Sequence, residues 1–234
     1  MTHDGAPSSL ALLKKQRSHM LFVLSGAEPG FEREFLQWYG GDYQRAASHH
    51  ADVLSVRHYA QHEVDITRGQ FPCLPFKYLG IYEISVDGAS AAGALIETVT
   101  QLHARERVAQ MPATWLYYPA NEKVGRSPAA LSSLLTVAFA NGIAGRENEF
   151  REWYATRHLR HALNIPALVS GQCFERTQFQ ACGAMEASFN TIAVYEQEGT
   201  PQDIVKSFAS LPHSTFDFPA LDVSRFSESV YQPI

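Results

Sequence analysis

The stretch EFREWYATRHL, residues 149–159, decides how the rest of this sequence is interpreted. Its apolar spacing predicts an amphipathic helix, and Asn164-Ile165-Pro166 then predicts a turn before a strand. A related stretch, EFLQWY at residues 34–39, lies 115 residues upstream. Without a gap, residues 30–60 and 145–175 are identical at nine of 31 positions, whereas chance gives about two. We infer that the chain is an internal duplication.

Both copies have the same predicted order of elements, strand–helix–strand–strand–helix–strand. In the first copy, the strands are expected at 19–25, 53–64, 78–85 and 114–118, and the helices at 31–49 and 90–110. In the second copy, the strands are expected at 134–140, 167–176, 191–196 and 228–233, and the helices at 147–163 and 201–211. This order predicts the α+β class with two tandem ferredoxin-like units, 18–120 and 131–234, joined by a linker at 121–130. Residues 1–17 are expected to form a flexible tail.

Composition narrows the classes of partner. The 234 residues have a formal net charge of −5, which argues against a nucleic-acid binder or a binder of anionic membranes. No apolar run approaches the roughly 20 residues of a membrane span, and no secretory signal is evident at the N-terminus. The odd number of cysteines (Cys73, Cys173 and Cys182) predicts a reduced, cytoplasmic protein.

The alternation of side chains along the strands predicts which sheet face is covered by helices. One set of positions is large and apolar, and we expect it to lie under the helices: Met20, Phe22, Leu24, Leu135, Val137 and Phe139. The opposite face has smaller residues together with the polar side chains Arg57, Tyr59, Tyr82, Gln172 and Tyr195. Small residues beside polar groups predict a small-molecule pocket between the two sheets. The alternative is that the sheets close on each other and these side chains bond among themselves.

The helix of the second copy carries the candidate catalytic residues. Phe150, Trp153, Tyr154, His158 and His161 are three or four positions apart, so they share one helix face. His158 has the chemistry of an acid or base, and Tyr154 that of a hydrogen-bond donor. The alternative for His158 is a bond to carbonyls near a helix C-terminus. Tyr43 replaces this histidine in the first copy, so the second copy is the better candidate. No closed set of metal ligands is present, and neither nucleotide nor hydrolase motifs occur.

The residues from Phe150 to His158, followed by Pro166 and Ser170, resemble the EthD-like branch of the dimeric α/β-barrel proteins. That branch typically has an F-x-x-W-Y-x-x-x-H-[LIV]-P pattern and then V-P-G-x-x-S. The sequence departs from it at Arg160, where proline is usual, and at Ala167, where glycine is usual. The resemblance implies that the two units close into a barrel with a central cavity. Superfamily members include cofactor-free monooxygenases, cyclases, lactone isomerases, small lyases and haem enzymes.

These observations lead to one main expectation for function. We expect a cofactor-free enzyme, of isomerase, lyase or monooxygenase type, that acts on a small hydrophobic or aromatic metabolite. His158 and Tyr154 are the expected catalytic residues, and the expected substrate-binding residues are Tyr82, Tyr195, Arg57, Tyr59, Gln172 and Trp153. The alternatives are a non-catalytic binding protein and a haem-binding relative. The chain is expected to be a monomer with an internal pseudo-dimer or a homodimer.

Overall fold

The computed structural model describes residues 18–86, 88–128, 134–177, 189–210 and 220–234. The first half contains β1 (His19–Ser25), α1 (Glu32–Trp38), η1 (Tyr39–Tyr43), α2 (Gln44–Ser48), β2 (Val53–Gln61), β3 (Tyr78–Ile84), α3 (Ala89–Ala104) and β4 (Ala113–Pro119). After the short β5 (Val124–Gly125), the second half contains β6 (Leu134–Ala140), α4 (Glu147–Trp153), η2 (Tyr154–His158), α5 (Leu159–Ala162), β7 (Leu168–Arg176), β8 (Thr191–Gln197), α6 (Pro201–Ala209), η4 (Val223–Arg225) and β9 (Ser227–Pro233). The predicted tail 1–17, Cys182 and the predicted helix end at Leu211 lie outside the described residues.

Eight antiparallel strands close into a barrel. Their order is β4-β1-β3-β2-β9-β6-β8-β7, and β4 pairs with β7 to complete the ring. The two halves therefore meet at two seams, where Tyr59 pairs with Pro233 and Tyr117 pairs with Arg176. The β5 strand, which was predicted to be part of a linker, pairs with Ser170 and Gly171 on the same edge of β7 as β4. The fold is thus α+β, with every main barrel strand paired on both sides.

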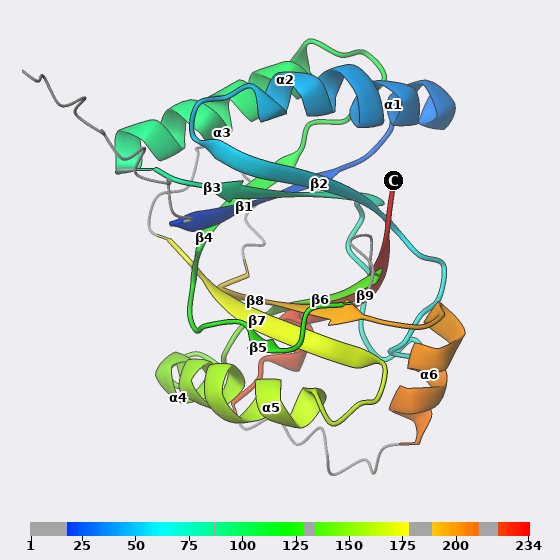
Figure 1. Ribbon diagram of the computed structural model, residues 1–234, viewed down its shortest axis with the longest axis vertical. Coiled ribbons are helices and arrows are strands. Elements are labelled where there is room, and N and C mark those ends of the chain that lie inside the picture. The colour runs from blue at the N-terminus through cyan, green and yellow to red at the C-terminus, as the bar shows by residue number, and fades with distance from the viewer. Residues whose placement is uncertain (1–17, 87, 129–133, 178–188, 211–219) are drawn as a thin grey trace, which may run out of the picture.

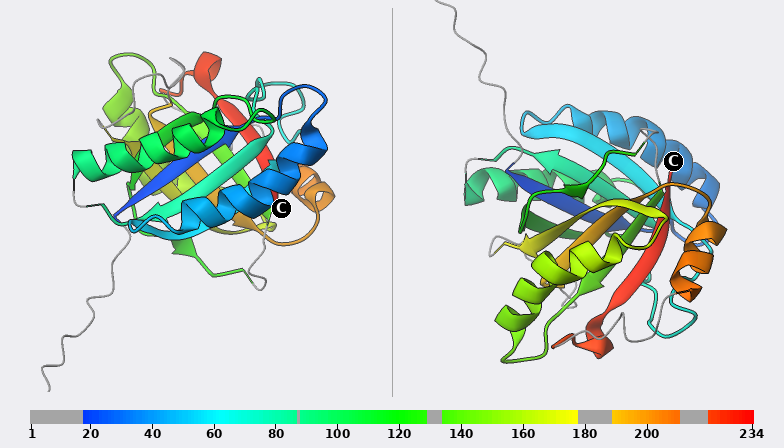
Figure 2. Two further views of the ribbon diagram at one scale, coloured as in Figure 1. Left: turned by 90° about the horizontal axis from the view of Figure 1, so that it is seen from above. Right: turned by 60° about the horizontal axis from the view of Figure 1, so that its bottom comes forward.

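Helices cover the barrel from opposite sides (Figure 1). In the first half, α1–α2 and α3 lie side by side across the sheet, as the view from above shows (Figure 2). In the second half, α4 and α5 cover the sheet, whereas α6 lies at its side beside β9. Ile204 of α6 packs there against Ile66 and Val230. No helix in the described ranges has the length and apolar character that crossing a membrane requires.

The barrel interior is filled by the largest apolar side chains, which corrects the predicted assignment of faces. Met20, Phe22 and Leu24 belong to one core cluster with Leu135, Val137 and Phe139, and this cluster joins both sheets. Phe22, for example, contacts Tyr117 and Phe174 edge-on at ring-centroid distances of 5.5 and 5.7 Å. These residues were expected under the helices. The smaller alternate positions, such as Ala138 and Ala140, lie there instead.

Tyr82 and Tyr195 were also placed on the wrong face. Arg57 pairs across the sheet with Ile81, and Gln172 with Val194, so each shares the interior face with an apolar partner. Tyr82 and Tyr195 therefore point toward the helices, whereas Arg57, Tyr59 and Gln172 do point between the sheets. A shift of one residue in register exchanges the two faces of a strand. Alternation within each strand therefore does not show which of its faces lies on the same side of the sheet as a given face of the next strand. Bulges in β2 and β7 add to this uncertainty of register.

A π-helical turn interrupts the helix at the same place in each half. Residues Tyr39–Tyr43 and Tyr154–His158 form these turns, at positions where one continuous helix was predicted. Such wider turns are frequent at functional sites because they redirect side chains locally. Here the turn of the second half contains both predicted catalytic residues, Tyr154 and His158.

Candidate functional site

The predicted site residues lie in three separate places. Trp153, Tyr154, His158 and Tyr195 lie between the helices and the sheet of the second half, a region that we call the second-half site. Tyr82 occupies the corresponding place in the first half. Arg57 and Gln172 line a cavity between the two sheets, and Tyr59 belongs to the core next to it. The structure therefore does not bring these eight residues into one pocket.

His158 stacks against two aromatic rings in the second-half site. Its ring centroid lies 4.7 Å from that of Tyr154, and the ring planes differ by 19°. Trp153 stacks on it at 5.0 Å. Burial, with a smaller contribution from His161, lowers the pKa of His158 to about 3. The imidazole is thus neutral at pH 7 and is a poor source of protons there.

A carboxyl group that the sequence interpretation missed faces this site from β9. Glu228 pairs across the sheet with Ala138, so its side chain lies on the helix-facing side. Burial raises the pKa of Glu228 to about 7, although part of the residue remains accessible to solvent. The Glu228 carboxyl also contributes to the raised pKa values of the buried Tyr154 and Tyr195, after burial itself. The signal in the sequence was an acidic residue at a core-facing position, two places before the buried Val230.

Small residues form the sheet surface beneath the helices of this site. They are Ala138, Ala193, Gly171 and Cys173. A β-carbon on Gly171 would lie 2.7 Å from Leu159 Cδ1 and 2.8 Å from Tyr195 Cδ1. Gly171 therefore permits the close packing that places the Tyr195 ring.

A cavity of about 270 Å³ lies on the same helix-facing side. Its lining residues are Gly142, Glu147, Phe150, Arg151, Glu175, Arg176, Thr177, Asn190 and Thr191. Phe150 connects it to the second-half site, since its ring centroid is 5.0 Å from that of Tyr154. Within the described residues, the buried Thr191 hydroxyl has no hydrogen-bond partner. The cavity is slightly smaller than the roughly 300–1,000 Å³ of typical small-molecule sites.

The corresponding region of the first half is closed by its own polar contacts. The Tyr82 hydroxyl donates a hydrogen bond of 2.7 Å to that of Tyr43. His58 stacks on Tyr39 at 4.1 Å. His103 of α3 lies 3.0 Å from the Ser25 hydroxyl. Burial lowers the pKa of His58 to about 3 and that of His103 to about 4. The helix α3, which has no equally placed counterpart in the second half, thus seals this region.

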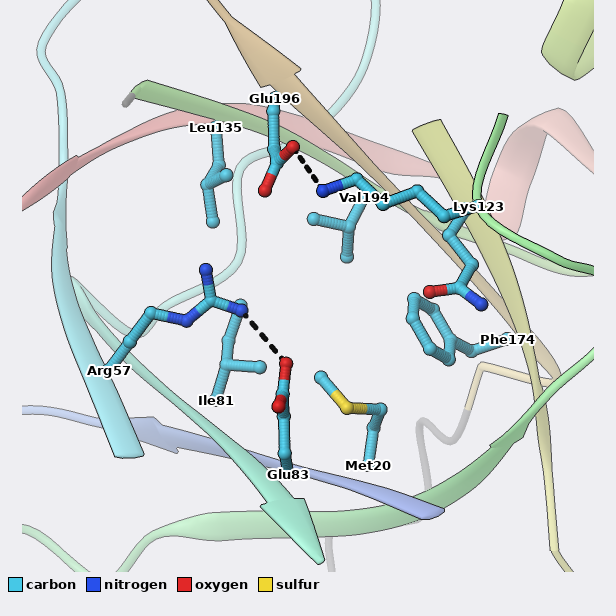
Figure 3. Close-up of a pocket in the computed structure, with 10 residues that line it drawn as sticks. Met20, Arg57, Ile81, Glu83, Lys123, Leu135, Phe174, Val194 and Glu196 are labelled. Carbon is cyan, nitrogen blue, oxygen red and sulfur yellow. Dashed lines mark hydrogen bonds and ion pairs between the residues drawn. The ribbon is translucent and has the colours of Figure 1, made fainter. Parts of the chain in front are cut away.

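The cavity between the sheets is smaller, and charged side chains lie beside an apolar wall (Figure 3). Its volume is about 60 Å³, and Met20, Ile81, Leu135, Phe174 and Val194 form its apolar wall. Two ion pairs lie at its edge, Arg57 with Glu83 at 3.3 Å and Lys123 with Glu196. The Gln172 side-chain amide, which also lines the cavity, donates to the Asn121 carbonyl at 2.8 Å. Large apolar side chains of the barrel interior bound this cavity.

The geometry of the described residues also bears on metal and haem binding. Among the described residues, no group of three or more histidine, cysteine or acidic side chains is arranged to hold a metal ion. Haem ligation commonly uses a histidine that opens onto the haem cavity. Of the described residues that line the 60 and 270 Å³ cavities, none is a histidine. The described side chains of these two cavities therefore do not fit a histidine-ligated haem.

Sequence comparison gives no relative for this chain. It matches no protein-family model. No curated protein has a significantly similar sequence.

Solved structures, in contrast, share its fold. An anthrone oxidase-like protein has a TM-score of 0.58 and 8% identity, and the match covers 94% of this chain and 92% of that protein. A protein from Fusobacterium nucleatum subsp. nucleatum, proposed to be a monooxygenase, has a TM-score of 0.55 and 10% identity, with 92% of each chain covered. A variant of chlorite dismutase from Candidatus Nitrospira defluvii has a TM-score of 0.54 and 10% identity, with 95% of this chain and 94% of the enzyme covered. These likenesses show that the chain has the dimeric α/β-barrel fold, as the sequence resemblance predicted.

Proposed function

We propose that the chain is an enzyme that moves a proton on a small carbonyl compound with an aromatic body, in the second-half site. Glu228 takes the proton from the carbon next to the carbonyl group. The enolate oxygen that forms accepts hydrogen bonds from Tyr154 and Tyr195. Glu228 then returns the proton to carbon, so the reaction is balanced without an oxidant or a cofactor. This is the chemistry of a cofactor-free isomerase.

The observation that carries this proposal is the position of a titratable carboxyl beside two phenol groups. A general base is most effective when its pKa lies near the working pH, and Glu228 has a pKa of about 7. Burial raises the pKa values of Tyr154 and Tyr195 well above the usual value, so both remain protonated donors. An acidic residue paired with phenol donors is an established solution for stabilising an enolate.

The surrounding residues support an aromatic substrate. Phe150, Trp153 and Tyr154 provide ring surfaces, and Phe150 also lines the 270 Å³ cavity. The anthrone oxidase-like neighbour is named for an aromatic ketone, which belongs to the same chemical class. His158 acts in this proposal as a neutral ring that holds Tyr154 in place, rather than as the group that moves the proton.

The finer features of the fold belong to the same proposal. Each half has the strand order of a ferredoxin-like unit, β4-β1-β3-β2 and β9-β6-β8-β7. We interpret the chain as a fusion of two such units, at 18–120 and 131–234, in which only the second keeps a reactive site. Membership of the EthD-like branch rests on the sequence pattern around Trp153, Tyr154 and His158.

Deuterium exchange tests the proposal directly. The protein is incubated in D2O with a panel of enolisable aromatic ketones that includes anthrone, and exchange at carbon is followed by NMR. We expect the unmodified chain to accelerate exchange for at least one ketone and Glu228→Gln to lose that acceleration. Glu198→Gln is the matched control, because Glu198 forms an exposed ion pair with Arg126. No acceleration by the unmodified chain, or equal acceleration by Glu228→Gln, would contradict the proposal.

A further inference from the structure

The cavity between the two sheets has no part in the proposed reaction, yet its lining is amphipathic. Its inner wall is apolar, formed by residues such as Leu135, Phe174 and Val194 from the second half. Its edge holds two cations and two carboxylates, from both halves of the chain. A short molecule with an apolar body and one charged end matches this arrangement.

The two ion pairs at the edge differ in how firmly they are held. Glu196 contacts Lys123 and also accepts a hydrogen bond of 2.5 Å from the Ser170 hydroxyl. Although burial raises the pKa of Glu196, these hydrogen bonds outweigh it and lower the pKa overall. An ammonium ligand would have to displace Lys123 from this doubly bonded carboxylate.

Arg57 has a weaker ion pair, and its guanidinium also bonds the Tyr59 hydroxyl while its charge acts on Glu196. Its ion pair with Glu83 is a single contact of 3.3 Å, and 41% of the Arg57 side chain and 29% of the Glu83 side chain are exposed. A guanidinium has five N–H donors and prefers two parallel bonds to a carboxylate. A ligand carboxylate can therefore replace Glu83, which can turn toward solvent. Because one carboxylate replaces another, the charge beside Arg57 stays balanced. Burial of the ligand's apolar part then favours binding.

We propose that this cavity binds a short-chain monocarboxylate, with the carboxylate on Arg57 and the alkyl part against Leu135 and Val194. The volume sets the size of the ligand. One water occupies roughly 30 Å³ in the liquid, and a cavity of about 150 Å³ holds benzene. The volume of about 60 Å³ thus accepts an alkyl part of very few carbons. Acetate and propionate have this size, whereas an aromatic acid does not.

Because Arg57 belongs to the first half and Leu135 and Val194 to the second, the bound acid would connect both halves. A ligand that binds only the folded state stabilises that state. The expected consequence is a rise in the melting temperature with propionate concentration. This second readout does not depend on catalysis.

The test is an NMR titration of the full chain with sodium propionate, in which the methyl signals of Leu135 and Val194 are followed. Propanol and propylammonium chloride are the matched probes of equal size. We expect saturable shifts with propionate, with millimolar affinity, and none with the other two. Arg57→Gln should weaken propionate binding about tenfold, which is the loss expected for a charged hydrogen bond of about 1.4 kcal/mol. Arg126→Gln, which alters an exposed arginine pair outside the cavity, should bind as the unmodified chain does.

A second variant protects the test against misfolding of Arg57→Gln. Val194→Phe fills the cavity while leaving Arg57 in place, and it should abolish the shifts of the Leu135 methyls. Shifts that do not saturate, that occur equally in Arg57→Gln, or that persist in Val194→Phe would overturn the proposal. Saturable binding of propylammonium in place of propionate would overturn the choice of a carboxylate. If neither propionate nor propylammonium bound, the proposal would be overturned as well, with water as the occupant of the cavity.

Discussion

Tyr154 and His158 stack with their ring planes 19° apart, and the corresponding pair in the first half, Tyr39 and Tyr43, stacks at 13°. Both pairs lie in the π-helical turns, so the same local geometry holds either a tyrosine or a histidine. This equivalence indicates that the imidazole of His158 serves first as a flat, neutral ring. The residue that distinguishes the second half is Glu228, since Thr114 occupies the matching position on β4.

The first prediction concerns His158. His158→Tyr should keep much of the exchange activity, because the first half shows that a tyrosine fits this stack. His158→Ala should lose activity through a displaced Tyr154. If His158 itself moved the proton, both variants would be inactive, and the pH profile would follow a group with a pKa of about 3. Rates of ketone exchange between pH 5 and 9 separate these outcomes.

The second prediction uses two buried glycines, Gly171 of β7 and Gly80 of β3, that each lie against a tyrosine ring. Gly171→Ala should displace Tyr195, because the added β-carbon would lie 2.8 Å from Tyr195 Cδ1. Gly80→Ala should displace Tyr82 to a similar extent, at 2.8 Å from Tyr82 Cε2. Each substitution should lower the free energy of unfolding by about 1–3 kcal/mol, as overpacking does.

Only Gly171→Ala should also reduce exchange activity, since Tyr82 lies outside the second-half site. Chemical denaturation gives the stability of the variants, and initial rates give their activity. Equal loss of activity in both variants would show that the effect of Gly171→Ala is general destabilisation.

The third prediction concerns acid stability. Three buried histidines have lowered pKa values in the folded state, about 3 for His58 and His158 and about 4 for His103. Below the unfolded value of 6.5, the unfolded chain binds protons that the folded chain does not. Each histidine then reduces stability by about 1.4 kcal/mol per pH unit until its folded pKa is reached.

Glu228 acts in the opposite direction. The pKa of Glu228 in the folded state, about 7, lies above the ordinary 4.5. The stabilising contribution of Glu228 to the free energy of unfolding is therefore lost as the pH rises from 4.5 through 7. The free energy of unfolding should therefore fall as the pH drops from 6.5, most steeply below 4.5, where Glu228 no longer offsets the histidines. His158→Tyr should have a shallower slope than the unmodified chain. Urea denaturation at several pH values measures both slopes, and identical slopes would contradict a neutral, buried His158.

The fourth prediction concerns the interior of the barrel. Phe22 is fully buried and contacts both Tyr117 and Phe174, so it connects the two halves. Phe22→Ala should cost about 3–5 kcal/mol of stability. Leu36→Ala is the control, because 37% of Leu36 is exposed. A small effect at Phe22 would contradict the assignment of the large side chains to the barrel interior.

The sequence was sufficient to predict an α+β barrel but not the arrangement of the site. The repeated Trp-Tyr pairs and the alternation of elements predicted the strand and helix order correctly. Alternation did not identify which face of β1 or β3 points into the barrel, because both faces of these strands are buried. The sequence of a single strand also does not specify its register with the neighbouring strand. Tyr82 and Tyr195 were misplaced for this reason.

Glu228 was missed for a related reason. Its significance depends on its position opposite Ala138 and on its surroundings, which raise its pKa. Neither is local in the sequence, since Ala138, Tyr154 and Tyr195 come from other elements. The π-helical turns were also beyond prediction, because the amphipathic spacing around residue 154 fits an ordinary helix equally well.

The most direct test of this account is the pKa of Glu228 in the folded protein. It can be measured from the carboxyl infrared band as the difference between the unmodified chain and Glu228→Gln, over a pH titration. We predict a band of the protonated acid that disappears with a midpoint near pH 7. A midpoint near the ordinary value of 4.5 would contradict the assignment of Glu228 as the group that moves the proton.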